Sequence, residues 1–99
     1  MIRHIVSWNF KPEISEEKRV EIRAALAEAF PTLVGKIPGL IAVSVGMPPL
    51  ESSNCDLALY CEMEEEKDLI IYRDHPEHVK IAEIVRANCE GRRCVDIKA

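Results

Sequence analysis

Two residues in the second half of the chain have the types and spacing for proton transfer. His78 lies three and four residues before Ile81 and Ala82, so on a helix it shares their apolar side. Tyr72 lies three residues after Leu69 and points inward in the same way. Histidine titrates near neutral pH, and a phenol can hold or relay a proton toward an enolising carbonyl. The pair therefore suits acid–base chemistry on a carbonyl compound.

A third candidate, His4, lies on the expected first strand and shares one face with Val6 and Trp8. Each strand has two sets of alternating side chains, and only one set can face the helices. If the set with Asp56, Tyr60 and Asp96 does so, these side chains complete a pocket with the first strand. The predicted pocket residues are Asp56, Trp8, Tyr60 and Asp96. A phenol, two imidazoles and carboxylates in one apolar pocket form a plausible acid–base constellation.

Two other interpretations of these side chains stay open. An inward histidine is more often hydrogen-bonded into the core than catalytic, and an inward tyrosine near a helix end is common packing. The spacing of His75 and His78 can bind a metal ion, but His75 precedes the expected helix and diverges from His78. We therefore predict no metal site and no cofactor.

The elements that must position these residues follow from the periodicity of the apolar side chains. Strands are expected at residues 2–10, 40–45, 55–63 and 92–97, and helices from Ser15 to about Leu33, at 64–73 and at 76–89. Pro31 should kink the first helix, Gly91 should end the last one, and residues 47–54 should form a loop. The order β-α-β-β-α-β is typical of a ferredoxin-like α+β fold, with one antiparallel four-stranded sheet and the helices on one face.

Length and composition restrict the partners of the chain. Ninety-nine residues with 47% hydrophobic and 30% charged side chains predict one globular domain over residues 1–99. A formal net charge of −4 and an aromatic content of 5% argue against nucleic acid and an anionic membrane surface as partners. No apolar run approaches membrane-spanning length and the N-terminus reads directly into a strand, so we expect a cytoplasmic protein.

The four cysteines are expected to be reduced, structural thiols. They are Cys55, Cys61, Cys89 and Cys94, and no two of them form a Cys-x-x-Cys motif. A disulfide framework is the alternative for an even count in a short chain, but such scaffolds are usually smaller, secreted and rich in loops.

The sheet face away from the helices is expected to be too apolar to lie in water. If Asp56, Tyr60 and Asp96 face the helices, this opposite face carries Ile5, Leu57, Leu59, Cys61, Met63, Val95 and Ile97. Alternation alone does not tell which side of each strand meets the helices, but either choice leaves a second apolar face. A two-fold dimer in which this face packs against its copy would bury it, so we expect a homodimer.

Five groups of short motifs lie in order along the chain. They are Met-Ile-Arg-His-Ile-Val with Phe-Lys-Pro (1–12), Ile-Pro-Gly (37–39), Cys-Asp-Leu-Ala-Leu (55–59), Tyr-Arg-Asp-His-Pro-Glu-His-Val (72–79) and Cys-Val-Asp-Ile (94–97). Together they resemble the stress-responsive A/B barrel domain family, called Dabb, and Tyr-x-x-His-Pro-x-His is the most specific of them. The resemblance implies a dimeric α/β barrel, in which two ferredoxin-like sheets face each other with helices outside.

The resemblance also implies roles for the candidate residues. One plant branch of the family contains a polyketide cyclase, in which a tyrosine and a histidine promote an intramolecular aldol condensation. These roles carry over onto Tyr72 and His78, and a histidine of the first strand carries over onto His4. The resemblance further implies that Asp56 and Asp96 point toward the helices.

This chain departs from the cyclase at three positions. Asp56 stands where the cyclase has a histidine, although Dabb domains generally have aspartate there, and Arg73 and Asp74 replace apolar neighbours of the tyrosine. The tyrosine and the histidine also occur in family members that are not known cyclases, so the match does not imply aldol chemistry. The expectation is a homodimeric Dabb protein with a small-molecule pocket and cyclase- or isomerase-like chemistry on a carbonyl compound. If the pocket is catalytic, we expect His78 to be the general base, Tyr72 the proton donor or carbonyl polariser, and His4 a positioning hydrogen-bonding group.

Two further functions compete with this one. A non-catalytic stress-response or regulatory dimer would have a structural polar core, fully hydrogen-bonded and without a cavity. Dimeric barrels also host haem-degrading and quinone-forming monooxygenases, but only fold analogy favours that chemistry, and the chain has no clear ligand set for it.

Overall fold

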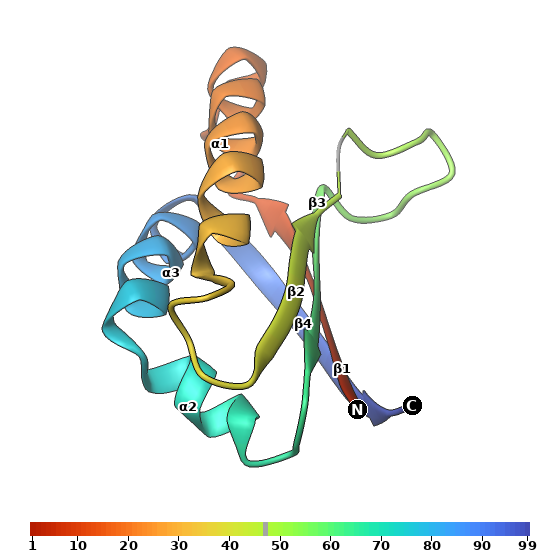
Figure 1. Ribbon diagram of the computed structural model, residues 1–99. Helices are drawn as coiled ribbons and strands as arrows, with labels where there is room; N and C mark the ends of the chain where they lie inside the picture. The colour runs from red at the N-terminus through yellow and green to blue at the C-terminus, as the bar shows by residue number, and fades with distance from the viewer. Residues whose placement is uncertain (47) are drawn as a thin grey trace.

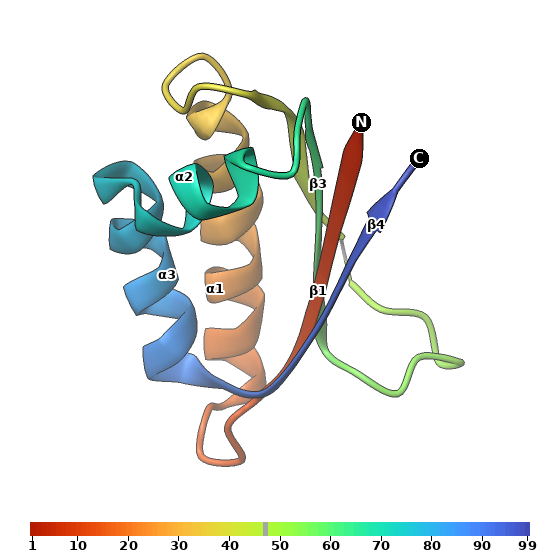
Figure 2. The same ribbon diagram turned by 90° about the horizontal axis from the view of Figure 1, so that it is seen from below.

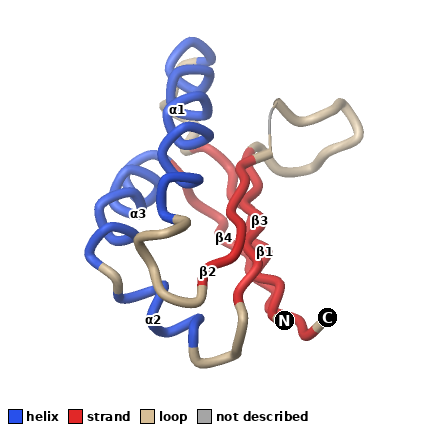
Figure 3. Tube along the Cα trace, in the orientation of Figure 1, coloured by secondary structure: helices blue, strands red, loops and turns tan. Residues whose placement is uncertain are grey.

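A four-stranded antiparallel sheet carries all helices on one side (Figures 1 and 2). The computed structural model describes residues 1–46 and 48–99, so Met47, expected in a loop, lies outside the described residues. The elements in order are β1 (Ile2–Phe10), α1 (Glu16–Ala29), the 3₁₀ helix η1 (Phe30–Leu33), β2 (Leu40–Val45), β3 (Leu57–Met63), α2 (Asp68–Asp74), α3 (Pro76–Asn88) and β4 (Cys89–Lys98). Residues 48–56 form a loop that extends away from the helices (Figure 3).

The strand order in the sheet is β2-β3-β1-β4, with every pair antiparallel. β1 is central, and His4 lies opposite Cys61 of β3 on one side and opposite Asp96 of β4 on the other. This pairing places residues that are about ninety positions apart in the sequence on neighbouring strands. The expected ferredoxin-like α+β fold is confirmed.

Local signals set the helix ends. The Ser15 hydroxyl caps α1 by accepting a hydrogen bond from the backbone N–H of Lys18 at 3.2 Å. Pro31 cannot donate to the helix ladder, and the chain tightens there into the 3₁₀ turn η1. Pro76 separates α2 from α3, because the preceding His75 is extended and caps α3. No helix in residues 1–46 and 48–99 is long and apolar enough to cross a bilayer.

The second helical segment begins later than the expected residue 64. The Asp68 carboxylate accepts a hydrogen bond from the backbone N–H of Glu65 at 2.9 Å, which forms a turn ahead of the helix. α2 therefore starts at Asp68, and the acidic residues before it lie in exposed turns.

The side of β3 that meets the helices differs from the expected one. Its buried residues, which were expected on the far side, are Leu57, Leu59, Cys61 and Met63. The pairing with β1 causes this, because residues opposite each other on antiparallel strands share one side of the sheet. We call the sheet side that meets the helices the inner side, and the opposite one the outer side.

The outer side keeps part of the expected apolar surface. Tyr60 and Val95 lie opposite Ile5 from the two neighbouring strands, and Ile97 lies opposite Arg3. Val95 and Ile97 are 51% and 43% exposed. The outer side therefore carries a smaller apolar patch than expected, with Tyr60 in place of the four residues of β3 and with Arg3 and Arg93 on the same side.

Gly91 was expected to end the last helix, but it lies inside β4. α3 ends at Asn88, and the pairing with β1 shifts by one residue between Ser7 and Asn9, which marks a β-bulge. Gly91 takes a φ of +66° at this bulge. A glycine adopts this left-handed conformation without steric cost, so the strand can begin directly after the helix.

We expect Gly39→Ala to destabilise the fold. Gly39 has a φ of +83°, and an added Cβ would lie 2.2 Å from Cγ of the buried Asp68. Gly35→Ala is the matched control, because Gly35 has a φ of +91° but nothing within 4 Å of the new Cβ. Backbone strain alone should cost the control about 1 kcal/mol, and Gly39→Ala should lose more stability because the clash adds to it. Urea unfolding measures both; equal losses would contradict the clash.

Candidate active site

A cavity of about 440 Å³ lies between α3 and the inner side of β1 and β4. His4, Val6 and Trp8 line it from β1, and His78, Val85 and Arg86 are among its residues from α3. The remaining lining residues are Phe30, Leu59, Arg73, Val79, Ala82, Cys89, Glu90, Gly91 and Arg92. This volume is within the range of small-molecule sites.

The ring of Tyr72 packs against the rings of the two histidines that line the cavity, His4 and His78. Its ring lies 4.2 Å from the ring of His78 and 5.7 Å from that of His4, measured between centroids. The three predicted catalytic residues, from β1, α2 and α3, thus form one aromatic cluster. Tyr72 is only 3% exposed and stands behind the cavity wall.

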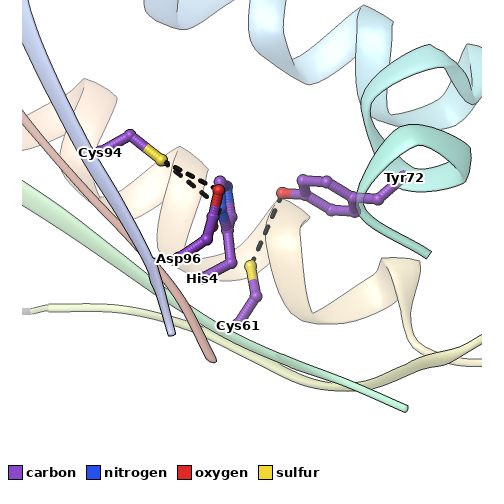
Figure 4. Close-up of polar contacts among 5 residues, drawn as sticks. All are labelled: His4, Cys61, Tyr72, Cys94 and Asp96. Atoms are coloured by element: carbon purple, nitrogen blue, oxygen red, sulfur yellow. Dashed lines mark hydrogen bonds and ion pairs between the residues drawn. The ribbon is translucent and has the colours of Figure 1, made fainter. Parts of the chain in front are cut away.

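His4 is held by Asp96. Its Nδ1 lies 2.5 Å from the Asp96 carboxylate, and this pair connects β1 to β4 (Figure 4). The Cys94 thiol lies 3.7 Å from both His4 Nδ1 and the second carboxylate oxygen. Burial, with the nearby Asp96 carboxylate, raises the pKa of Cys94, so the thiol stays protonated and can donate to Asp96.

Donor types alone would also permit a metal ion at His4, Cys94 and Asp96, whose ligand atoms lie within 4.8 Å of one another. Two ligands bound to a tetrahedral zinc ion at about 2.0–2.1 Å are separated by roughly 3.3 Å. The 2.5 Å between His4 and Asp96 is shorter than that. The arrangement therefore fits a hydrogen-bonded group better than a metal centre.

His78 has the tautomer and the pKa of a base. Its Nδ1 lies 3.1 Å from the backbone carbonyl oxygen of Arg73, so Nδ1 carries the proton and Nε2 is left with its lone pair. Burial lowers the pKa of His78; the Arg73 carbonyl opposes this shift, and the positive charges of Arg92 and Arg86 add to it. The imidazole is therefore neutral at neutral pH.

Tyr72 has the properties of a hydrogen-bond donor. The phenol oxygen lies 3.8 Å from the thiol of Cys61, which donates to it (Figure 4). Burial raises the pKa of Tyr72 well above its ordinary value, and the pKa of Cys61 to about 12. Both groups stay protonated, and the phenol proton is available to another acceptor.

The structure separates the predicted pocket residues into three groups. Trp8 lines the cavity, and Asp96 reaches it by its hydrogen bond to His4. Tyr60 lies on the outer side of the sheet, because it pairs with Ile5 rather than with an inward residue of β1. It is therefore not part of the site, contrary to expectation.

Asp56 also lies away from the cavity. Its carboxylate accepts a hydrogen bond from the backbone N–H of Phe10 at 3.0 Å and lies 3.8 Å from the Arg19 guanidinium. It borders a second hollow of about 270 Å³ next to the loop at 48–53. Asp56 thus fixes the end of β3 against β1 and α1 and does not contact the aromatic cluster.

Sequence reasoning missed four residues at the site. Cys61 and Cys94 contact Tyr72 and His4, and Arg86 and Arg92 line the cavity. Alternation with Asp96 could have indicated Cys94 and Arg92, whereas the position of Cys61 depends on the register of β3 against β1. All four cysteines are free thiols, as expected.

Comparison with solved structures supports the fold. A dimeric protein of unknown function with a ferredoxin-like fold from Bacteroides fragilis is 28% identical, with a TM-score of 0.91 over 99% of this chain and 95% of that one. A dimeric ferredoxin-like protein of unknown function from Thermobifida fusca is 25% identical, with a TM-score of 0.80 over 99% and 90%. Hydroxynitrile lyase from Passiflora edulis is 16% identical, with a TM-score of 0.72 over 97% and 90%, and shares the fold alone.

The family follows from the sequence as a whole. No functionally curated protein matches the chain at a significant level. The family described as the stress responsive A/B barrel domain matches residues 2–99, which include the site residues of β1, α2, α3 and β4. The chain therefore belongs to the stress responsive A/B barrel domain family, Dabb.

Proposed function

We propose that the cavity binds a small carbonyl compound and that its wall catalyses cyclase- or isomerase-like proton transfer. The observation that carries this proposal is the placement of the basic Nε2 of a neutral His78 at a cavity of about 440 Å³, with the protonated phenol of Tyr72 against the same imidazole. An imidazole base and a phenol acid in contact are the two groups that enolisation needs.

The reaction begins with proton abstraction. His78 takes a proton from the carbon next to the carbonyl, and the electron pair of that C–H bond moves toward the carbonyl oxygen. Once a ligand enters between the two histidines, the Tyr72 phenol behind them donates a hydrogen bond to that oxygen and keeps its own proton, because burial raises its pKa, so an enolate forms. Return of the proton from the His78 imidazolium to another carbon completes an isomerisation. Attack of the enolate on a second carbonyl group, whose oxygen takes that proton, completes a cyclisation.

His4 has a positioning role in this proposal. The hydrogen bond to Asp96 fixes the imidazole of His4, and the ring in turn packs against Tyr72. Because the Asp96 carboxylate accepts from Nδ1, the other ring nitrogen is available to a bound ligand. His4 thus orients both the phenol and the carbonyl compound.

A non-catalytic dimer module is the second candidate. Hydrogen bonds among the polar groups favour it, since His4 contacts Asp96 and Tyr72 contacts Cys61. It also requires that no cavity of ligand size lies beside these groups, and the cavity next to His4 and His78 argues against that. The ligand-binding function is therefore the better-supported one.

We also propose that the functional unit is a homodimer formed by the outer sides of two sheets. Ile5, Tyr60, Val95 and Ile97 supply an apolar surface, and the Bacteroides fragilis and Thermobifida fusca proteins are described as dimeric. Such a dimer leaves the cavity free, because the cavity lies on the inner side of each sheet.

Thermal shift with a panel of cyclic ketones and polyketide-like compounds tests ligand binding. We expect some of them to raise the melting temperature of the wild type, and to raise that of a Tyr72→Phe/His78→Ala double variant less, because binding stabilises only the folded state. The absence of any shift in the wild type, or equal shifts in the double variant, would count against the proposal.

A further inference from the structure

The cavity is apolar at its base and positively charged at its mouth. Buried residues such as Val6, Leu59 and Val85 form the base. The mouth carries three exposed arginines, which are Arg73, Arg86 and Arg92. The lining includes one carboxylate, that of Glu90, among the residues that the structure describes. This excess of positive charge contrasts with the net charge of −4 of the whole chain.

Two of these arginines have no carboxylate partner. Arg73 is paired with Asp74, whose oxygens lie 2.9 and 3.1 Å from the guanidinium nitrogens. Within residues 1–46 and 48–99, neither Arg86 nor Arg92 has a carboxylate oxygen within 4.0 Å. Glu90 does not form an ion pair with either arginine, but its negative charge balances one of their two positive charges. The lining around Arg86, Arg92 and Glu90 therefore keeps one excess positive charge.

Both free arginines belong to elements that also carry the site. Arg86 lies eight residues after His78 on α3, about two turns along the same side of the helix. Arg92 lies two residues before Cys94 and shares the inner side of β4 with Asp96. Their charges reach the site, because both help to lower the pKa of His78. Because both arginines line the same cavity as His78 and His4, a ligand whose charged group binds them would have the rest of its body within that cavity.

We propose that the ligand of this cavity is an organic anion, whose carboxylate or phosphate group binds Arg86 and Arg92 and whose apolar, carbonyl-bearing body fills the cavity. Guanidinium groups suit this task, because their planar arrays of N–H donors match the oxygens of carboxylates and phosphates. The inference rests on the proposed function and adds the charge class of the substrate to it.

Three matched probes test the charge preference by isothermal titration calorimetry on the full chain. They are 6-acetyl-2-naphthoate, 6-acetyl-2-naphthyl phosphate and the neutral 6-acetyl-2-naphthamide, which share the aromatic body and the ketone. We expect both anions to bind about 10-fold tighter than the amide at low salt, since a charge-assisted contact is stronger than a neutral one. High salt should reduce this difference, because the arginines are exposed. The tighter of the two anions identifies the oxyanion group.

Variants locate the effect at the two arginines. Arg86→Gln and Arg92→Gln should each weaken binding of the tighter anion by about 3- to 10-fold and leave binding of the amide unchanged. Arg93→Gln is the matched control on β4, because Arg93 pairs with Ser7 and faces the outer side. Lys80→Gln is the control on α3, because Lys80 does not line the cavity. Both controls should bind all three probes like the wild type.

The outcomes separate this inference from the proposed function. If the amide binds as tightly as the anions, the inference is overturned while a carbonyl-binding cavity stands. If the anions bind selectively but deuterium exchange next to their ketone is not accelerated, the inference stands and the proposed catalysis fails. If no probe binds, both are overturned.

Discussion

Replacing His78 by glutamine is expected to slow deuterium exchange next to the carbonyl of a bound ketone by about 100- to 10,000-fold, the usual contribution of a general base. Glutamine can still donate to the Arg73 carbonyl oxygen, as Nδ1 of His78 does at 3.1 Å, but it offers no basic nitrogen to the substrate. NMR measures the exchange of the ketone that gives the largest thermal shift with the wild type.

His75→Asn is the matched control for this experiment. His75 caps α3 by accepting from the backbone N–H of Glu77, and asparagine is a favourable capping residue. It does not line the cavity, so exchange should stay at the wild-type rate. Wild-type exchange in His78→Gln would remove His78 from the mechanism.

The pH dependence of the same exchange reports the environment of His78. Only the neutral imidazole can accept a proton, and burial holds the pKa of His78 below its ordinary value of 6.5. A lowered pKa keeps the base form present as the pH falls. The pH at which the rate falls to half its maximum should therefore lie below 6.5. A midpoint at or above pH 6.5 would show that the imidazole is not desolvated.

Val95→Lys is expected to convert the dimer into a folded monomer. Val95 is 51% exposed on the outer side of the sheet, next to Ile5. In the proposed dimer the new ammonium would be buried in an apolar interface without a partner, at a cost of more than about 3 kcal/mol, which weakens association by at least about 100-fold. Sedimentation velocity over a wide range of protein concentrations measures the change.

Val20→Lys is the control for this substitution. Val20 is 56% exposed on α1, and the helices lie on the inner side of the sheet, away from the proposed interface (Figure 2). The variant should sediment like the wild type. A wild-type chain that is monomeric at all concentrations, or a Val95→Lys variant that still dimerises, would contradict the outer side as the interface.

The helix and strand pattern was largely predictable, because most elements carry their own local signals. A serine cap opens α1, Pro31 shortens it, and Pro76 divides the second helical segment. The start of β4 was not predictable in the same way. Gly91 looks like a helix terminator in the sequence, but the pairing of Cys89 with Phe10 makes it part of a bulged strand.

The sides of the sheet were harder to predict than the strands. In β3 the inward residues, such as Leu59, are apolar, whereas in β4 the apolar Val95 faces outward and Asp96 faces inward. Alternation indicates two sides of a strand but does not identify them when both are buried in the proposed assembly. Only the register with β1 resolves this, and it placed Tyr60 outside the site.

The candidate site was predictable in its centre but not in its surroundings. Tyr72 and His78 are close in sequence and joined by two short helices, so their spacing predicted their contact. The thiol of Cys61 and the charge of Arg92 come from strands whose positions depend on long-range pairing. Sequence thus predicted that Tyr72 and His78 lie together, while the tertiary structure supplied the groups that surround them.

The β-bulge at Gly91 has a consequence for the shape of the cavity wall. In a regular strand, residues three positions apart face opposite sides, yet Cys89 and Arg92 both face the cavity. The bulge therefore divides β4 into two parts. Cys89 and Glu90 pair with Phe10 and Asn9, and residues 93–98 pair with residues 2–7 of β1. Residues 90–92 line the cavity at the point where the pairing with β1 shifts, while Arg93 and the residues after it pair regularly with β1. We therefore expect substitutions in this short segment to change the wall of the cavity and leave the pairing of the rest of β4 with β1 in place.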